Sequence, residues 1–517
     1  MEKETGYLIM ARKMAYCYLF LFNSLFLFWF TDYYYNLNDS KYYFYITITA
    51  ITLLISGVLF ALHKLQLKKD NQTTTWKQLI HLSITDKLLF LCLCSYLITT
   101  IISSYPSASC YGMIRHTGLI FALFLAGTYA IVSRLYQQQQ SILLLFLGSV
   151  GVVVIIGMLQ FFNIDPLGFF QEVSDYQSNF YLSTMGNINF FSSLICLSLP
   201  LTIVLYLYCE NTTSKILYSI SMILCFIGLM IANSDSGYFG IFTLLLIIAY
   251  FALKNIQYLK RYFIVLLYFL GTFKLMGILI YFMQDSCREL HTFSHFIAYR
   301  PITWIFLVIV GIAYLLMDVY TSPCEKYFKG IQKVGRGLLL LIVILAIGLF
   351  LYYSFIDTKQ PLGTFANYLR YNDAWGTGRG LIWNRVLYSY TQLPFLQLLF
   401  GHGLDTTRLL LIDTFGETMA LYDNAHNEIL QYLVTTGIVG LLCYLSTLIS
   451  SLKRLWIFIK KEPYAFAIAA TMLCYFIQAI VNINQPITTP FLFMFLGIGE
   501  SFIRQEQTQP IKQDVKN

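Results

Sequence analysis

A histidine at the entrance to a long apolar segment is the strongest candidate for chemistry in this sequence. His426 lies in the polar run 423–428, and an apolar run begins at Ile429. We therefore expect the imidazole where a hydrophilic loop re-enters a bilayer, a depth at which ionisable side chains are functional candidates. Imidazole is also well suited to moving protons near neutral pH. The alternative is a histidine that merely ends a loop at the membrane surface.

The neighbours of this histidine have two interpretations each. Asp423 is the nearest carboxylate that would raise the basicity of His426, or it is a plain anion at a helix N-terminus. Asn427 either caps the following helix or fixes the imidazole tautomer. Gly437 and Gly440 follow on the same segment, and their spacing lets a neighbouring helix approach closely.

A second candidate is an arginine flanked by glycines. The stretch Gly376-Thr377-Gly378-Arg379-Gly380 precedes a segment that reads as an amphipathic helix from Leu381. Arg379 is then expected at a helix N-terminus, where backbone N–H groups already favour anions and a guanidinium adds a bidentate phosphate grip. Arg385, farther along this helix, is a further candidate substrate contact. The alternative is a loop arginine that meets lipid headgroups or a carboxylate.

Polar clusters from earlier segments are expected on the same face of the membrane. Arg115 lies in a loop that enters a helix, Asn187 and Asn189 begin another helix, and Asp235 lies in the turn between two short ones. We take these four residues, with Asn427, as candidate substrate contacts. Their convergence predicts an active site outside the cytoplasm. We see no carboxylate pair arranged for metal binding and expect neither a metal nor a cofactor.

The composition requires a lipid environment to position these groups. Of 517 residues, 57% are hydrophobic and 12% charged, whereas a soluble chain has about 25% charged residues. The apolar runs are long, which predicts an all-α, polytopic transmembrane helix bundle of about 14 spans and argues against a transmembrane β-barrel. The net charge of +8 does not indicate nucleic acid, because the basic residues fall in particular loops between spans. Most of the 11 cysteines lie inside apolar runs and show no metal-binding spacing.

Lysine and arginine fix the predicted orientation. Seven basic segments, including the N-terminus and the loops after the second, fourth, eighth, tenth and twelfth spans, fall on one side if the count is even. That side is the cytoplasm, so both termini are expected there. The predicted organisation is an N-terminal membrane part over 1–356, a large extracytoplasmic loop over 357–426, C-terminal spans over 427–503 and a cytoplasmic tail over 504–517. The aromatic and apolar content of the loop predicts that it is ordered and packs on the membrane part.

Taken together, the motifs resemble the O-antigen ligase superfamily. The pattern His426-Asn427-x9-Gly437-x-x-Gly440 looks like its signature, and Gly378-Arg379 followed by Trp383 looks like its loop arginine motif. Two further motifs are similar: Gly186-Asn187-Ile188-Asn189-Phe190 running to Leu199-Pro200, and the early loop with Tyr105-Pro106, Gly112, Arg115 and Gly118-Leu119. The resemblance covers about residues 85–500. One departure is Asp235, which stands where many members have an arginine thought to help bind the lipid diphosphate.

The resemblance implies a multi-pass glycosyltransferase of the bacterial cytoplasmic (inner) membrane. Its donor would be a glycan on polyprenyl diphosphate (undecaprenyl diphosphate in bacteria), and its acceptor a hydroxyl of a second glycan or lipid-linked glycan. His426 would be the general base, and Arg379, alone or together with Arg115, would stabilise the leaving group. Ligase, repeat-unit polymerase and protein oligosaccharyltransferase all remain open. A transporter or flippase of lipid-linked sugars is the alternative from another class, but it predicts internal repeats and polar groups near the midplane of several spans.

Overall fold

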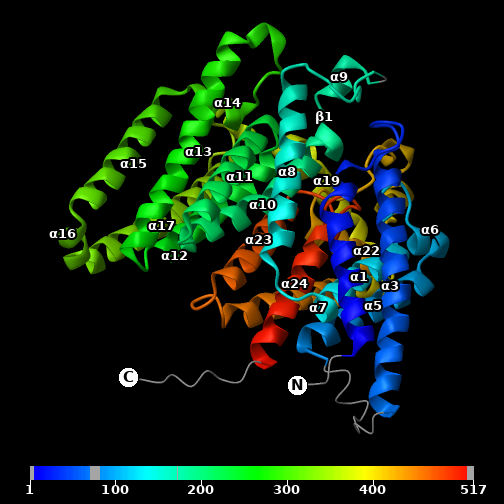
Figure 1. The fold of residues 1–517 in the computed structure, drawn as a ribbon. Helices are drawn as coiled ribbons and strands as arrows, with labels where there is room; N and C mark the ends of the chain where they lie inside the picture. Colours follow the sequence, from blue (N-terminus) through cyan, green and yellow to red (C-terminus); the bar gives the residue numbers. More distant parts are fainter. Residues whose placement is uncertain (1–4, 70–81, 172, 509–517) are drawn as a thin grey trace.

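The computed structural model describes residues 5–69, 82–171 and 173–508, and this part of the chain is almost entirely helical (Figure 1). A helix overlaps each of the roughly 14 predicted apolar runs, which confirms the all-α polytopic class. These helices are α1 (Gly6–Asn23), α3 (Leu37–Lys69), α5 (Ile84–Ile102), α7 (Leu119–Leu135), α8 (Gln140–Phe161), α10 (Ile188–Tyr208), α11 (Thr212–Ile231), α12 (Asp235–Ala252), α13 (Ile256–Phe282), α15 (Pro301–Val319), α17 (Phe328–Leu351), α22 (Glu428–Trp456), α23 (Pro463–Ala479) and α24 (Thr489–Thr508).

Short elements connect the long helices. They are α2 (Leu25–Phe28), α6 (Pro106–Tyr111), α9 (Asp175–Ser178), α14 (Thr292–Tyr299), α16 (Thr321–Lys326), α18 (Ala366–Leu369), α19 (Trp375–Thr391), α20 (Phe395–Phe400) and α21 (Thr407–Phe415). Strands β1 (Tyr181–Leu182) and β2 (Gly186–Asn187) pair antiparallel, with Tyr181 opposite Asn187. This small hairpin leads directly into α10.

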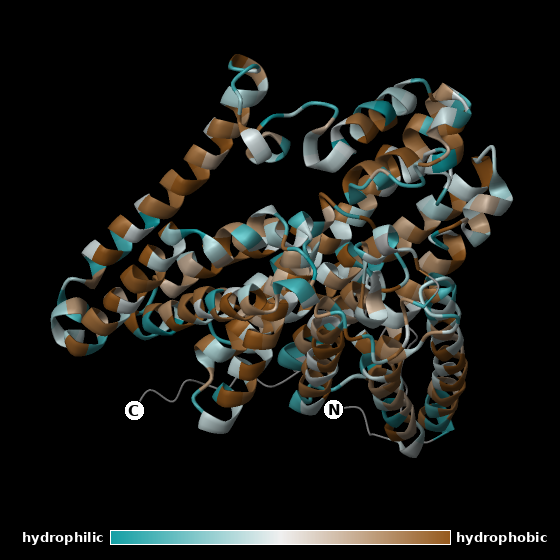
Figure 2. Cartoon of the chain, turned by 90° about the horizontal axis from the view of Figure 1, so that it is seen from above, coloured by the Kyte–Doolittle hydropathy of each residue, from teal (hydrophilic) through white to brown (hydrophobic). Residues whose placement is uncertain are grey.

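Ten of the described helices are long and apolar enough to cross a membrane, and α7 and α23 are shorter apolar helices. Figure 2 shows hydrophobic residues along most of each helix and hydrophilic residues mainly in the connections. Helix α10 is the centre of the bundle. In its apolar stretch of 18 residues 94% are buried, and the helix packs against α11, α12 and α23. Helices α15 and α17 are only 6% buried by the same measure, so their apolar sides face lipid.

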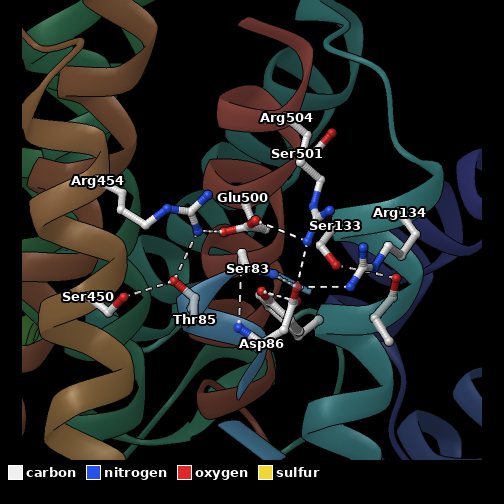
Figure 3. A network of polar contacts seen from close by, with 12 residues as sticks. Ser83, Thr85, Asp86, Ser133, Arg134, Ser450, Arg454, Glu500, Ser501 and Arg504 are labelled. Atoms are coloured by element: carbon white, nitrogen blue, oxygen red, sulfur yellow. Dashed lines mark hydrogen bonds and ion pairs between the residues drawn. The ribbon is translucent and has the colours of Figure 1, made fainter. Parts of the chain in front are cut away.

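An ionic cluster ties four helices together at one end of the bundle (Figure 3). Asp86 at the start of α5 pairs with Arg134 at 2.9 Å and with Arg504 at 2.6 Å. Arg504 also lies 3.1 Å from Glu500, and Glu500 pairs with Arg454 at the end of α22. The ends of α7, α22 and α24 thus meet the start of α5, which agrees with the prediction that these basic segments share one side.

The long loop over 357–426 is ordered, as predicted. It contains α18 to α21, and its apolar side chains form a small hydrophobic core of their own against α22. The members of that core are Ile382, Val386, Leu410, Leu411, Met419, Ala425 and Val434. At the other end of the chain, α24 continues to Thr508, into the predicted tail, and residues 509–517 lie outside the described part.

Candidate active site at the outer end of the bundle

The backbone around His426 forms a tight turn immediately before α22. The His426 N–H donates to Oδ1 of Asn424 at 2.9 Å, and His426 adopts φ 49°. Asn427 is the N-cap of α22, because its side chain accepts a hydrogen bond from the Leu430 N–H at 3.0 Å. Of the two roles predicted for Asn427, the structure therefore shows the cap. The turn fixes the imidazole at the point where the loop enters the bundle.

Arg379 emerges from a left-handed turn. Gly376, Thr377 and Gly378 have φ values of 59°, 61° and 94°, a conformation that glycine adopts readily and threonine rarely. A side chain at Gly380 would place its Cβ 1.8 Å from the carbonyl oxygen of Asn372, so only glycine fits at that crossing. This confirms that the glycines interrupt the chain before the helix that continues to Thr391.

The Arg379 guanidinium uses only some of its hydrogen-bond donors within the protein. Its Nη1 donates to the carbonyl oxygen of Gly376 at 2.6 Å and lies 3.3 Å from Oγ1 of Thr377. Its Nε is buried and has no hydrogen-bond partner among the described residues. A buried guanidinium N–H without a partner leaves a donor for an anionic ligand.

Arg379, Asp235 and His426 belong to one electrostatic cluster. Burial lowers the pKa of Arg379, and the negative charge of Asp235 opposes that shift. Asp235 begins α12, and its Oδ1 accepts a hydrogen bond from the Tyr368 hydroxyl at 3.0 Å. The structure thus brings the aspartate of the α11–α12 turn and the arginine of the long loop together, although about 140 residues separate them.

The loop that carries Arg115 is held against the same site. The Nε of Arg115 lies 2.8 Å from Oδ2 of Asp423, and its guanidinium lies 5.9 Å from the centre of the Phe190 ring. Asp405 secures the loop, because its Oδ2 accepts hydrogen bonds from the Met113 N–H at 2.6 Å and the Thr117 N–H at 3.2 Å. The early loop with Arg115, the start of α10 with Phe190 and the segment with Asp423 therefore meet, and Asp423 lies three residues before His426 in the sequence.

The surroundings of His426 favour the neutral imidazole. Burial is the largest cause and the positive charge of Arg379 the second, and together they lower the pKa of His426 to about 4. Asp423 raises that pKa, as predicted, but the two larger effects outweigh it, and Arg115 adds to the lowering. At neutral pH the imidazole is therefore unprotonated and can accept a proton.

The two asparagines at the start of α10 have positioning contacts. Asn187 is the N-cap of α10, and its Oδ1 accepts from the Asn189 N–H at 2.8 Å. Asn189 in turn accepts a hydrogen bond from the Ser234 hydroxyl at 2.7 Å. This contact holds the start of α10 beside the turn that carries Asp235. Whether either asparagine also touches substrate stays a prediction.

Arg385 makes no hydrogen bond or ion pair with the other candidate site residues in the part of the chain that the structure describes. Its side chain is exposed on α19, and its guanidinium lies 4.6 Å from the centre of the Phe415 ring. Its interaction with Phe415 is a stacking contact within the loop. A role for Arg385 in substrate binding likewise stays a prediction.

The sequence interpretation did not single out three residues of this region. Tyr368 and Asp405 lie in the long loop among many polar residues, and nothing in their spacing marks them. Glu428 carried a signal: it is an acidic residue in the first turn of a predicted membrane helix. It is fully buried and accepts a hydrogen bond from the Tyr444 hydroxyl.

Within residues 5–69, 82–171 and 173–508, three or more His, Cys, Asp or Glu side chains nowhere gather in a group that could hold a metal ion. The positive charges of the site come from its arginines.

Comparison with known protein families supports the resemblance over part of the chain. A family model described as O-antigen ligase matches residues 290–445, a segment that contains Arg379, the rest of the long loop and His426. The match confirms the resemblance that the motifs predicted for this segment, and the apolar helices make the chain a multi-pass membrane protein. No curated protein matches the chain.

Proposed function

We propose that this protein transfers a glycan from a polyprenyl-diphosphate carrier to an acceptor hydroxyl on the outer face of the bacterial cytoplasmic membrane. The observation that carries the proposal is a histidine at the start of α22 whose pKa is lowered by burial and by the charges of Arg379 and Arg115, and Arg115 pairs with nearby Asp423. That combination supplies a base for an incoming hydroxyl and positive charge for a departing diphosphate.

In the proposed reaction His426 takes the proton of the acceptor hydroxyl. The resulting oxygen attacks the anomeric carbon of the donor glycan, and a new glycosidic bond forms while the bond to the diphosphate breaks. The polyprenyl diphosphate leaves with the electron pair, and the guanidinium of Arg379 stabilises its growing charge. We expect the reaction to need no metal, because arginine supplies the positive charge that a metal would otherwise provide.

Asp235 has a positioning role in this scheme. Its carboxylate acts on the half-buried Arg379 through its charge and accepts from Tyr368, so it would favour a guanidinium held toward the donor. Arg115 is the second cationic group that can bind the diphosphate, and its pairing with Asp423 keeps it beside His426. We therefore assign the diphosphate to Arg379 and Arg115 in place of the arginine that many relatives carry at the α11–α12 turn.

A ligase and a repeat-unit polymerase share this chemistry and differ in the acceptor. The experiment is glycan assembly in a deletion strain complemented with wild type, His426→Ala or Arg379→Ala, with membrane levels of each protein measured. His295→Ala serves as the matched control, because this exposed histidine on α14 contacts the Tyr299 ring and lies outside the segment 357–426.

We expect both site variants to reach the membrane, lose surface polysaccharide and accumulate lipid-linked glycan on the outer face. Long chains on the accumulated carrier would indicate a ligase, and single repeat units would indicate a polymerase. Normal polysaccharide in both site variants would overturn the proposed function.

A further inference from the structure

A pocket lined with tyrosines shares no lining residue with the cluster around His426. It lies between the α2–α3 connection and the segment that precedes α10, and its volume is about 190 Å³. Its lining includes Asp32, Tyr33, Tyr34, Tyr35, Gln177 and Tyr181, and we call it the tyrosine pocket. This volume is sufficient for one small ring.

The inner wall of the tyrosine pocket is fixed in place. The Tyr34 hydroxyl donates to Oε1 of Gln160 at 3.1 Å and to the carbonyl oxygen of Ser183 at 2.9 Å. Its ring stacks on Tyr181 with centroids 4.8 Å apart, and it also contacts Phe169. A buried, hydrogen-bonded aromatic wall offers a flat face in a defined orientation.

The outer rim carries exposed and polar groups. Tyr35 is 87% exposed, and Asp32 uses Oδ2 to accept from the Asn36 side-chain amide at 2.9 Å. Asp32 and Tyr33 both adopt φ 50°, a left-handed conformation that is costly for residues with side chains and is concentrated at functional sites. Gln177 adds an exposed amide on the opposite side.

The pocket is connected to the proposed active site through the start of α3. The side-chain amide of Asn38 donates to the Ile114 carbonyl oxygen at 3.2 Å, and Asp39 lies 2.8 Å from Nε2 of His116. Ile114 and His116 flank Arg115, which pairs with Asp423 beside the catalytic turn. Figure 1 shows the upper end of α3, β1 and α9 on the same side of the molecule. The chain that lines the pocket therefore runs directly into the start of α3, which holds the loop that carries Arg115.

We propose that the tyrosine pocket binds one sugar ring of the glycan, beyond the ring that reacts. This inference rests on the proposed function. Tyrosine faces suit the apolar C–H faces of a pyranose, while Asp32, Gln177 and the tyrosine hydroxyls suit its hydroxyl groups. Binding energy from a remote sugar then places the reacting end.

The first test uses Tyr35→Ala and the double variant Tyr33→Ala/Tyr35→Ala in a transfer assay with purified full-length protein and the host's lipid-linked glycan. Tyr281→Ala is the matched control, since this exposed tyrosine lies at the outer end of α13 and contacts Phe282. We expect KM for the glycan to rise about tenfold in the pocket variants, with kcat changed less, and no change in the control. Wild-type KM in both pocket variants would overturn the inference, while loss of activity in His426→Ala would still support the proposed function.

The second test measures binding without turnover. The probe is the oligosaccharide released by mild acid from the host's own lipid-linked glycan, and saturation-transfer NMR detects its contact with the full chain in nanodiscs. We expect contact with wild type and with His426→Ala but much weaker contact with Tyr33→Ala/Tyr35→Ala. Equal contact with that double variant would overturn the inference. Lower protein levels in the membrane beside that result would mean that the tyrosines are interfacial anchors.

Discussion

His426 and Arg379 are linked by charge, and this link predicts the pH dependence of the reaction. In the free protein the pKa of His426 is lowered to about 4, so the imidazole stays unprotonated as pH falls from 8 to about 5. We expect kcat/KM to be flat over that range and to fall only at lower pH, whereas an ordinary histidine would lose half of its base form near pH 6.5. The measurement is a pH–rate profile in nanodiscs.

Arg379→Gln sharpens this test. The substitution removes a positive charge that lowers the pKa of His426, so the acid limb of the residual activity should move up toward pH 6.5. An acid limb that stays in place would show that another group titrates in the profile.

Arg379 also supports a prediction of its own. Because its guanidinium has an unpartnered buried Nε, Arg379→Ala should lower kcat by roughly 100-fold, the usual cost of removing one donor from a developing negative charge. Arg379→Lys keeps a charge but loses the planar fork, and we expect it to fall between Ala and wild type. Rates are to be compared at saturating donor. A lysine variant as slow as alanine would show that geometry and not charge is what the site requires.

At the level of elements, α20 and α22 touch backbone to backbone. A Cβ at Gly437 would lie 2.3 Å from the backbone of Leu399, and one at Gly401 would lie 2.2 Å from the carbonyl oxygen of Thr435. Gly437 also has φ 66°. The predicted close approach at Gly437 is therefore confirmed, and its partner is a short helix of the long loop.

Gly437→Ala should consequently destabilise the protein by about 2 kcal/mol, through overpacking and an unfavourable backbone conformation. The measurement is thermal unfolding in detergent, and the expected change is a clear drop in Tm. Gly348→Ala on α17 is the control, because a Cβ there meets nothing within 4 Å. A Tm for Gly437→Ala equal to that of the control would contradict this packing.

At the level of the whole molecule, the ionic cluster of Figure 3 ties the ends of α7, α22 and α24 to the start of α5. Glu500 is fully buried and pairs with Arg454 and Arg504. Removing one partner of a buried ion pair leaves charge without compensation, so Glu500→Ala should cost about 3 kcal/mol of stability. Unfolding in detergent measures this cost, and the double variant Arg454→Ala/Glu500→Ala should recover part of it. An additive double variant would show that the two side chains do not interact.

The cluster also bears on orientation. Arg134, Arg454 and Arg504 meet Asp86 and Glu500 at one end of the bundle, and basic loops face the cytoplasm. A green fluorescent protein fused after residue 517 should therefore fluoresce, since it matures in the cytoplasm. Alkaline phosphatase inserted at the exposed Leu421 should be active because the long loop lies outside. The reverse pattern would invert the proposed topology and place His426 on the cytoplasmic face.

The sequence by itself determined the all-α polytopic class of this protein and the approximate position of each membrane helix, and it singled out His426 and Arg379 as candidates. These follow from local patterns, because apolar run length, loop charge and turn glycines act through the residues next to them. Only the tertiary structure decided which partners these residues have. Arg115 pairs with Asp423, and the charge of Asp235 acts on Arg379, across long stretches of chain. Burial outweighs the aspartate that was expected to make His426 more basic, and burial depends on how distant helices pack, which no local pattern encodes.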